Sequence, residues 1–289
     1  MTVAGFTFIR NAIKYDYPII EAIMSVLPFC DEFVVAVGRS DDETLQLIEN
    51  INDPKIKIIE TVWDDSLREG GRVLAVETDK AFQAIGEKAD WCFYIQGDEV
   101  VHEKYHATIL NDMLKYKDDH RVEGLLFKYR HFYGSYDYVA TSSGWYKNEI
   151  RVVKNDKNIY SYKDAQGFRI DHNKRLKVKQ IDAYIHHYGW VKPPENMQAK
   201  QETFQKLWHG DDWVEVNVPK REAFDYSGID RLARYDGTHP AVMMDRIKRL
   251  NWTFDHDITK NKISFKDRCK EWANKYLGLD FNDKNYVKI

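Results

Sequence analysis

The chain has 289 residues, of which 31% are charged and 43% are hydrophobic, as in an ordinary soluble globular protein. Its net charge of −3 argues against non-specific nucleic-acid binding, which depends on a basic surface. No apolar run approaches the roughly 18 residues of a membrane span. Arg10 and Lys14 interrupt the only early apolar run, so no signal peptide is expected either.

The three cysteines indicate a compartment. Cys30, Cys92 and Cys269 are odd in number and far apart, and Cys92 lies inside an apolar run. This usage disfavours a disulfide framework and predicts a reducing compartment, the cytoplasm.

Strand and helix patterns alternate through the first hundred residues. Apolar runs predict four strands, over Val3–Ile9, Phe33–Val37, Ile56–Val62 and Trp91–Ile95. Between them, apolar residues at helical spacing predict three helices, after Tyr17-Pro18, over Thr44–Ile51 and over Gly71–Ile85. Repeated βαβ units of this kind predict an α/β protein with a parallel sheet.

The pattern is less regular after Val100. We expect a helix over Glu103–Leu114, and further strands over Gly124–Tyr129, Glu149–Val153 and Leu176–Tyr184. Pro193-Pro194 breaks the chain, and helical patterns follow over Asn196–Leu207, Ala241–Leu250 and Phe265–Leu277. We therefore place a main domain at residues 1–192 and a mostly helical extension at residues 193–289.

The fourth strand ends at the acidic stretch Gln96-Gly97-Asp98-Glu99. Ligands of open parallel sheets bind at the carboxyl ends of the strands, and acids there can hold a divalent cation that in turn holds phosphate. The alternative interpretation is a polar turn that happens to be acidic. His186-His187, after a later strand pattern, could complete a cation site begun by Asp98.

Polar loops after the four strands leave the same edge of the predicted sheet. Such convergence favours a nucleotide pocket, although any one loop alone is better interpreted as a solvated turn. The candidate binding residues in these loops are Arg10, Asn11, Gly38, Ser40, Asp41, Asp64, Gln96 and Asp98.

Two glycines precede the third helix. Gly70-Gly71 could let Arg68 or Arg72 reach a diphosphate, or could serve only as a helix entry. The stretch is not a Walker loop, because its glycine spacing and the Lys-Ser/Thr pair are missing. No GxGxxG follows the first strand, which counts against a dinucleotide-binding oxidoreductase.

Several motifs together resemble glycosyltransferase family 2 and its relatives with the GT-A fold. The resemblance covers roughly residues 3 to 200 and rests on FIRN, VAVGRSDDET, TVWDDSLREGG, DWCFYIQGDEV and IHHYGWVKPPENM. It implies a Rossmann-like, mostly parallel sheet flanked by helices, with a helical C-terminal extension. Residues 1–100 would then form the donor half, and residues 101–192 the acceptor half.

The resemblance also implies a metal site. Gln96-Gly97-Asp98 stands where the family has Asp-x-Asp, so Asp98, Glu99 and His187 are the implied ligands of Mn²⁺ or Mg²⁺. Gln96 can hydrogen-bond ribose but cannot supply the charge of the first aspartate. Whether the cation is required therefore stays open.

The implied reaction moves a sugar from a UDP- or GDP-linked donor to an acceptor hydroxyl, with inversion, in surface glycan or polysaccharide synthesis. A glycan, a lipid-linked sugar or another hydroxyl compound would be the acceptor, and peripheral membrane contact stays open. Asp164 is favoured over Glu149 as the base that deprotonates it, since relatives place an acid before their final core strand. Aromatic side chains that could stack on the acceptor are those of Tyr133, Trp145 and Trp190.

Two other classes compete with this prediction. A sugar-phosphate nucleotidyltransferase would use the same acidic edge, but it would usually have a glycine-rich, lysine-bearing loop after the first strand, and FIRNAIKY is not such a loop. A non-catalytic carbohydrate-binding protein on a GT-A fold is suggested by Gln96.

Overall fold

The N-terminal half of the sheet consists of four parallel strands. The computed structural model describes residues 1–67, 69–262, 265–277 and 285–289. The four strands lie in the order β3-β2-β1-β4, as the crossover connections of βαβ units require. Their bounds are β1 Val3–Ile9, β2 Glu32–Gly38, β3 Ile56–Thr61 and β4 Trp91–Tyr94.

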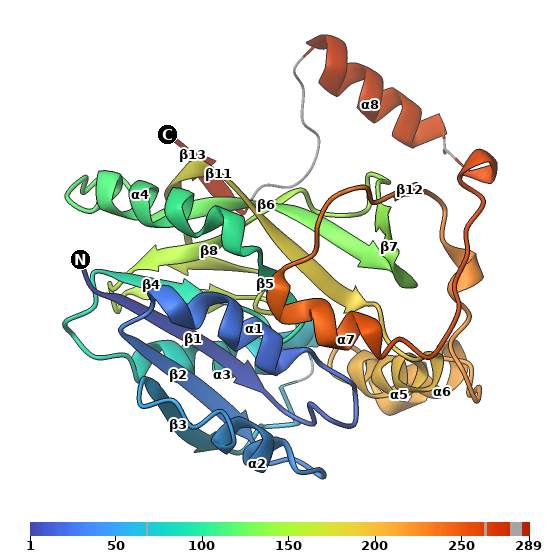
Figure 1. Ribbon diagram of the computed structural model, residues 1–289, viewed down its shortest axis with the longest axis horizontal. Coiled ribbons are helices and arrows are strands. Elements are labelled where there is room, and N and C mark those ends of the chain that lie inside the picture. The colour runs from blue at the N-terminus through green and yellow to red at the C-terminus, as the bar shows by residue number, and fades with distance from the viewer. Residues whose placement is uncertain (68, 263–264, 278–284) are drawn as a thin grey trace.

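Helices cover both faces of this half, because each has one apolar face (Figure 1). On one face, α1, α2 and α4 bury residues such as Ile23, Ile48 and Ile109. On the other face, α3 buries Val73 and Phe82. The helices are α1 Ile19–Val26, α2 Thr44–Glu49, α3 Arg72–Gln83 and α4 His106–Tyr116.

The second half continues the sheet from β4 with mixed strand directions. The order continues as β8-β6-β11-β10-β9, where β8 is antiparallel to both β4 and β6 and β6 is parallel to β11. The α/β class predicted from the sequence is confirmed. The bounds are β6 Gly124–Tyr133, β8 Asn148–Lys154, β9 Ile159–Tyr162, β10 Gly167–Ile170 and β11 Lys174–Trp190.

Short strands complete the sheet and were not predicted. They are β5 Glu99–Val101 and β13 Tyr286–Lys288, which pair with β11, and β7 Ser135–Ala140 and β12 Leu232–Arg234, which pair with each other. After residue 129 the chain continues as the end of β6, turns at Gly134 and returns as β7. Gly134 has a φ of 72°, and a Cβ there would lie 2.5 Å from the ring of Phe254.

The described residues from 193 onward form four α-helices and connecting segments besides the short strands β12 and β13. The arrowheads of β1 and β11 point toward the end at which α5 lies (Figure 1). The helices are α5 Pro194–Gln205, α6 Asp211–Asn217, α7 Met244–Lys248 and α8 Phe265–Leu277.

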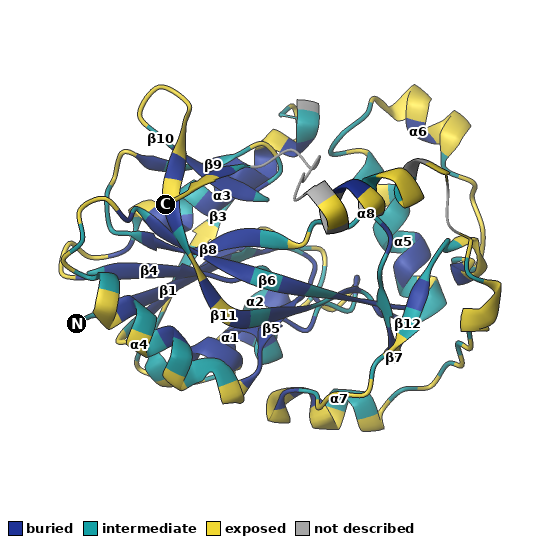
Figure 2. Ribbon diagram, turned by 90° about the horizontal axis from the view of Figure 1, so that it is seen from above, coloured by how far each residue is buried: buried dark blue, intermediate teal, exposed yellow. Residues whose placement is uncertain are grey.

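Burial is concentrated in the sheet. Its central strands are almost wholly buried, whereas α6, α7 and α8 carry many exposed side chains (Figure 2). The three cysteines are free, as expected. Of the helices in the described parts of the chain, none is both long and apolar enough to cross a membrane.

Candidate active site

A cavity of about 690 Å³ opens where β1 and β4 end, a size typical of small-molecule sites. The predicted edge of the sheet forms its floor, with Arg10, Gln96 and Asp98. The end of β11 adds His187 and Trp190. One further wall comes from helix α5 and the residues just after it, namely Lys200, Gln201, Thr203, Phe204, Gln205, Lys206 and Leu207.

Helix α5 is tied to the main domain near both of its ends. Asn196 Nδ2 donates to the carbonyl of Lys14 at 3.0 Å, and Gly71 N donates to the carbonyl of Leu207 at 3.2 Å. A role for this helix in the site was not predicted from the sequence. The available signal was a stripe with i, i+4, i+7 spacing, in which Lys200 stands beside the apolar residues Phe204 and Leu207.

Asp98 lies on the cavity floor between two basic side chains. Its Oδ2 accepts a hydrogen bond from Lys200 Nζ at 3.3 Å, and its Oδ1 lies 3.7 Å from His187 Nε2. Burial alone would raise the pKa of Asp98, but the charge of Lys200, which also donates a hydrogen bond to it, holds that pKa well below its usual range. Asp98 is therefore ionised at neutral pH.

Gly189 is what allows these groups to meet. A Cβ at this position would lie 2.7 Å from both Asp98 Oδ2 and His187 Nε2, closer than side-chain atoms can approach. The sequence pattern gave this glycine no role.

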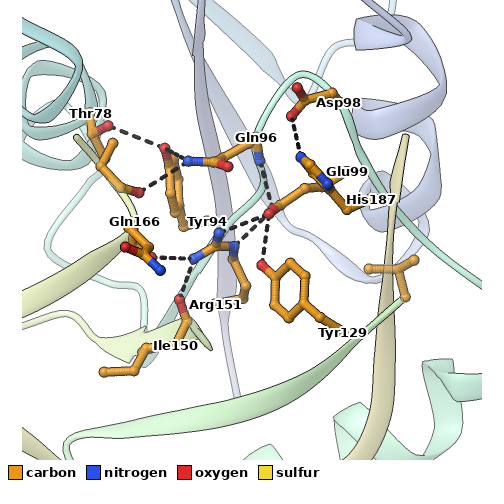
Figure 3. A network of polar contacts seen from close by, with 12 residues as sticks. Thr78, Tyr94, Gln96, Asp98, Glu99, Tyr129, Ile150, Arg151, Gln166 and His187 are labelled. Carbon is orange, nitrogen blue, oxygen red and sulfur yellow. Dashed lines mark hydrogen bonds and ion pairs between the residues drawn. The ribbon is translucent and has the colours of Figure 1, made fainter. Parts of the chain in front are cut away.

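A chain of hydrogen bonds sets the tautomer of His187. His131 Nε2 lies 2.8 Å from the carbonyl of Tyr146, which can only accept, so this nitrogen carries the proton. Burial lowers the pKa of His131 to about 3 and also lowers that of His187, so both rings are neutral. His131 Nδ1 must then accept from His187 Nδ1 at 3.0 Å. This leaves His187 Nε2 as a bare lone pair that faces the Asp98 carboxylate (Figure 3).

Two electron-pair donors that face each other suit a cation. The 3.7 Å between His187 Nε2 and Asp98 Oδ1 is too long for a hydrogen bond, and imidazole with carboxylate is a donor set that Mn²⁺ accepts. Among the described residues, however, no group of three or more His, Cys, Asp or Glu side chains is placed to hold a metal ion. Asp98 and His187 would hold a cation only if substrate or water supplied its other ligands.

Glu99, expected beside Asp98 on the cation, instead points away from the cavity. Its two carboxylate oxygens accept from Arg151 Nε and Nη2 at 2.7 and 2.8 Å, and Tyr129 OH donates to Oε1 at 2.7 Å (Figure 3). The side chains of Glu99 and Arg151 are fully buried. Because both of its oxygens are held by Arg151 and Tyr129, the carboxylate of Glu99 is not positioned to join Asp98 on one metal ion. We therefore do not retain Glu99 as a metal ligand.

Gln96 joins the acidic turn to the loop that carries Asp164. Its Nε2 donates to the carbonyl of Ala165 at 3.1 Å and lies 3.3 Å from Tyr94 OH. A carboxylate could not donate these hydrogen bonds. The amide at position 96 therefore holds two loops together in addition to lining the cavity floor.

The two candidate bases differ in their access to the cavity. Asp164 lines it and is half-buried, and burial raises its pKa. Glu149 does not line it. Its Oε1 accepts from Gln166 Nε2 at 2.8 Å, and its buried Oε2 has no hydrogen-bond partner among the described residues.

We predict that Glu149 makes stability depend on pH. Burial, opposed by the charge of Arg151, raises its pKa from 4.5 to about 8, so folding takes up a proton between these values. The contribution of this carboxyl group to the free energy of unfolding is therefore full below about pH 4.5 and falls as pH rises to about 8. In urea unfolding, the free energy of unfolding of Glu149→Gln relative to that of wild type should rise by about 2–4 kcal/mol between pH 5 and pH 8.5. Glu215→Gln, at an exposed position, is the control, and parallel profiles for Glu149→Gln and wild type would contradict the prediction.

Of the nucleotide candidates in the first loops, Arg10 lines the cavity. Its Nη1 donates to Asp65 Oδ1 at 2.9 Å, and its guanidinium lies 5.4 Å from the centre of the Trp63 ring. Asp65 and Trp63 also line the cavity, whereas the neighbouring Asp64 does not.

The other candidates join loops together or point elsewhere. Asn11 Oδ1 accepts from Asp41 N at 2.8 Å, and Ser40 Oγ accepts from Asn11 N at 3.0 Å. The indole of Trp63 covers Gly38, where a Cβ would lie 2.3 Å from its Nε1. Arg72 is exposed and lies outside the cavity, and Arg68 lies outside the described residues.

Comparisons with known proteins give only distant similarities. No family model and no curated protein matches the chain. Among solved structures, S. aureus TarS 1–349 in complex with UDP is similar at 15% identity with a TM-score of 0.40, over 77% of this chain and 68% of that one. The chain covers 41% of the longer S. aureus TarS.

Two other solved structures are more distant still. Glucosyl-3-phosphoglycerate synthase from Mycobacterium tuberculosis, with Mn²⁺, UDP and phosphoglyceric acid, is similar at 14% identity and a TM-score of 0.31, over 45% of this chain and 43% of that one. A 4-diphosphocytidyl-2C-methyl-D-erythritol synthase from Anaerococcus prevotii is similar at 9% identity and a TM-score of 0.32, over 53% of this chain and 70% of that one. These scores do not assign the chain to a family.

Proposed function

We propose that this protein is a glycosyltransferase that moves a sugar from a nucleotide-diphosphate donor to an acceptor hydroxyl with inversion. The observation that carries the proposal is one pair of side chains at the carboxyl ends of the strands. The Asp98 carboxylate and the bare Nε2 of His187 face each other in the cavity. Such a pair suits a divalent cation, which in this reaction would neutralise charge on the departing diphosphate.

The donor is expected to lie along the floor of the cavity. Arg10 would contact phosphate or ribose, and the ring of Trp63 would support the nucleotide base. Gln96 would hydrogen-bond the donor through its carbonyl oxygen, since its amide nitrogen already donates to the carbonyl of Ala165. UDP and GDP are the nucleotides to test first.

The acceptor is expected to enter beside Trp190 and Tyr146, which both line the cavity. Tyr133 stacks on Trp190 with ring centres 5.7 Å apart, and Trp145 packs edge-on against Trp190 at 5.9 Å. Of the three aromatic residues predicted to meet the acceptor, Trp190 would therefore offer its ring to a sugar. Tyr133 and Trp145 would hold that ring in place.

In the reaction, the acceptor oxygen attacks the anomeric carbon and its proton passes to the base. The bond from that carbon to the phosphate oxygen breaks, and the diphosphate leaves with the electron pair. Asp164 is the proposed base, because it lines the cavity and burial raises its pKa toward the range in which carboxylates accept protons efficiently.

For this base, Asp164→Asn should keep donor affinity and lower the transfer rate by about 10²–10⁴-fold, since the amide cannot take a proton. Calorimetry with the donor and a transfer assay measure the two effects separately. Glu149→Gln, behind the cavity wall, is the matched control and should transfer at close to the wild-type rate. Wild-type transfer by Asp164→Asn would rule this residue out as the base.

The proposed function is tested by a thermal-shift panel of UDP- and GDP-sugars with and without Mn²⁺. A donor that binds the folded state raises the melting temperature by mass action. The donor that stabilises the protein is then incubated with candidate hydroxyl acceptors. Stabilisation by free sugars but by no nucleotide would favour a carbohydrate-binding protein, and pyrophosphate release from a nucleoside triphosphate would favour a nucleotidyltransferase.

A further inference from the structure

Lys200 reaches the cavity floor from the helix on the opposite wall. Its Nζ donates to Asp98 Oδ2 at 3.3 Å and to the carbonyl of Gly189 at 3.2 Å, and its side chain is only 11% exposed. The rings of Tyr17 and Phe204 lie 5.0 and 5.8 Å from the ammonium. This lysine thus holds the carboxylate that the proposed cation would need.

A second lysine lies beside the same tyrosine. Lys192 is fully buried, its Nζ donates to the carbonyl of Asp16 at 2.8 Å, and it lies 4.2 Å from the centre of the Tyr17 ring. Burial lowers the pKa of Lys192 well below its usual range, so the positive charge that holds Asp98 is that of Lys200. A divalent cation that joins Asp98 and His187 would enter a region already carrying positive charge, whereas an anion that meets Lys200 would relieve it.

We propose that Lys200 is an internal counter-ion that holds Asp98 until the donor's diphosphate draws it away, so that cation and diphosphate bind cooperatively. This inference rests on the proposed donor site. In the absence of substrate, the ammonium competes with the cation for one carboxylate. A diphosphate offers Lys200 a stronger partner and frees Asp98 for the cation.

Removal of the Lys200 charge should strengthen the binding of Mn²⁺ and weaken the binding of pyrophosphate. Lys200→Met should bind Mn²⁺ alone about tenfold tighter, because the competing ammonium is gone. The same variant should bind pyrophosphate about 10- to 100-fold more weakly, because a charge-assisted hydrogen bond is lost. In wild type, pyrophosphate should tighten Mn²⁺ binding, and in Lys200→Met this coupling should be largely lost.

The measurements need no substrate turnover. Electron paramagnetic resonance of free Mn²⁺ gives the metal affinity with and without pyrophosphate, and calorimetry gives the affinities for pyrophosphate and UDP. Lys200→Arg keeps the charge and should bind Mn²⁺ alone as weakly as wild type. Lys220→Met removes a lysine that is exposed and outside the cavity, and should leave all affinities unchanged. Lys200→Gln repeats the test with a polar side chain if Lys200→Met unfolds.

Two results would overturn the inference: Mn²⁺ binding by Lys200→Met that is no tighter than in wild type, or undiminished coupling between Mn²⁺ and pyrophosphate in that variant. Failure of the proposed function gives a different result. Wild type would then bind neither UDP nor GDP, while the competition between Lys200 and Mn²⁺ for Asp98 would still be measurable with the metal alone.

Discussion

Asp98→Asn should lower sugar transfer about 10³-fold or more while the protein stays folded. The amide keeps the shape of the side chain but removes the negative charge that faces His187 and Lys200 in the cavity. Transfer assays under saturating donor, together with circular dichroism, measure the two parts of this expectation. Mn²⁺ affinity should fall in parallel.

Asp98 also contributes to stability, because it is only 8% exposed and neutralises Lys200. The loss of one charged hydrogen bond should lower the free energy of unfolding by about 1–3 kcal/mol. Wild-type turnover by Asp98→Asn, or wild-type turnover in excess chelator, would contradict the catalytic part of the prediction and the metal role respectively.

Glu99→Gln should have the largest effect on stability of the substitutions considered, a loss of about 3–5 kcal/mol in the free energy of unfolding. The amide would leave the guanidinium of Arg151 buried without a counter-charge, and one of the two oxygens that accept from Arg151 and Tyr129 would become an NH₂ donor. Urea unfolding measures the effect.

The exposed pair of Asp119 and Arg121 offers a matched control. Its side chains are 23% and 81% exposed, so Asp119→Asn should change the free energy of unfolding by no more than the experimental error. If Glu99→Gln instead kept wild-type stability and lost Mn²⁺ affinity, Glu99 would be a metal ligand as the sequence resemblance implies.

The cavity floor could be predicted from the sequence, because parallel pairing determines where the strand ends lie. Each of the first four strands has an apolar run that ends in polar residues, and parallel pairing carries all four ends to one edge. That reasoning placed Arg10, Gln96 and Asp98 correctly on the cavity. The sequence could not distinguish loop residues that line the cavity from loop residues that join two loops. Asn11 and Ser40 are of the second kind, and only their three-dimensional contacts show it.

The cavity wall formed by helix α5 could not be predicted, because it depends on contacts between residues far apart in the chain. Lys200 lies 102 residues from Asp98 in the chain, and neither residue's local sequence encodes their meeting. The role of Glu99 was misjudged for a similar reason. A carboxylate next to Asp98 has the composition of a metal motif, and only the distant Arg151, 52 residues away, shows that it is a core ion pair.

The contacts of α5 also bear on how far this protein could be altered by exchanging segments. The helix is bonded to Lys14 at its beginning, to Gly71 just past its end and to Asp98 across the cavity. Residues 193–289 therefore do not behave as a detachable module whose replacement would simply change the acceptor. A chimaera with a break at Pro193 would have to preserve contacts with three separate parts of the first hundred residues. New specificities are more accessible through single substitutions on the wall beside Trp190, which leave those attachments in place.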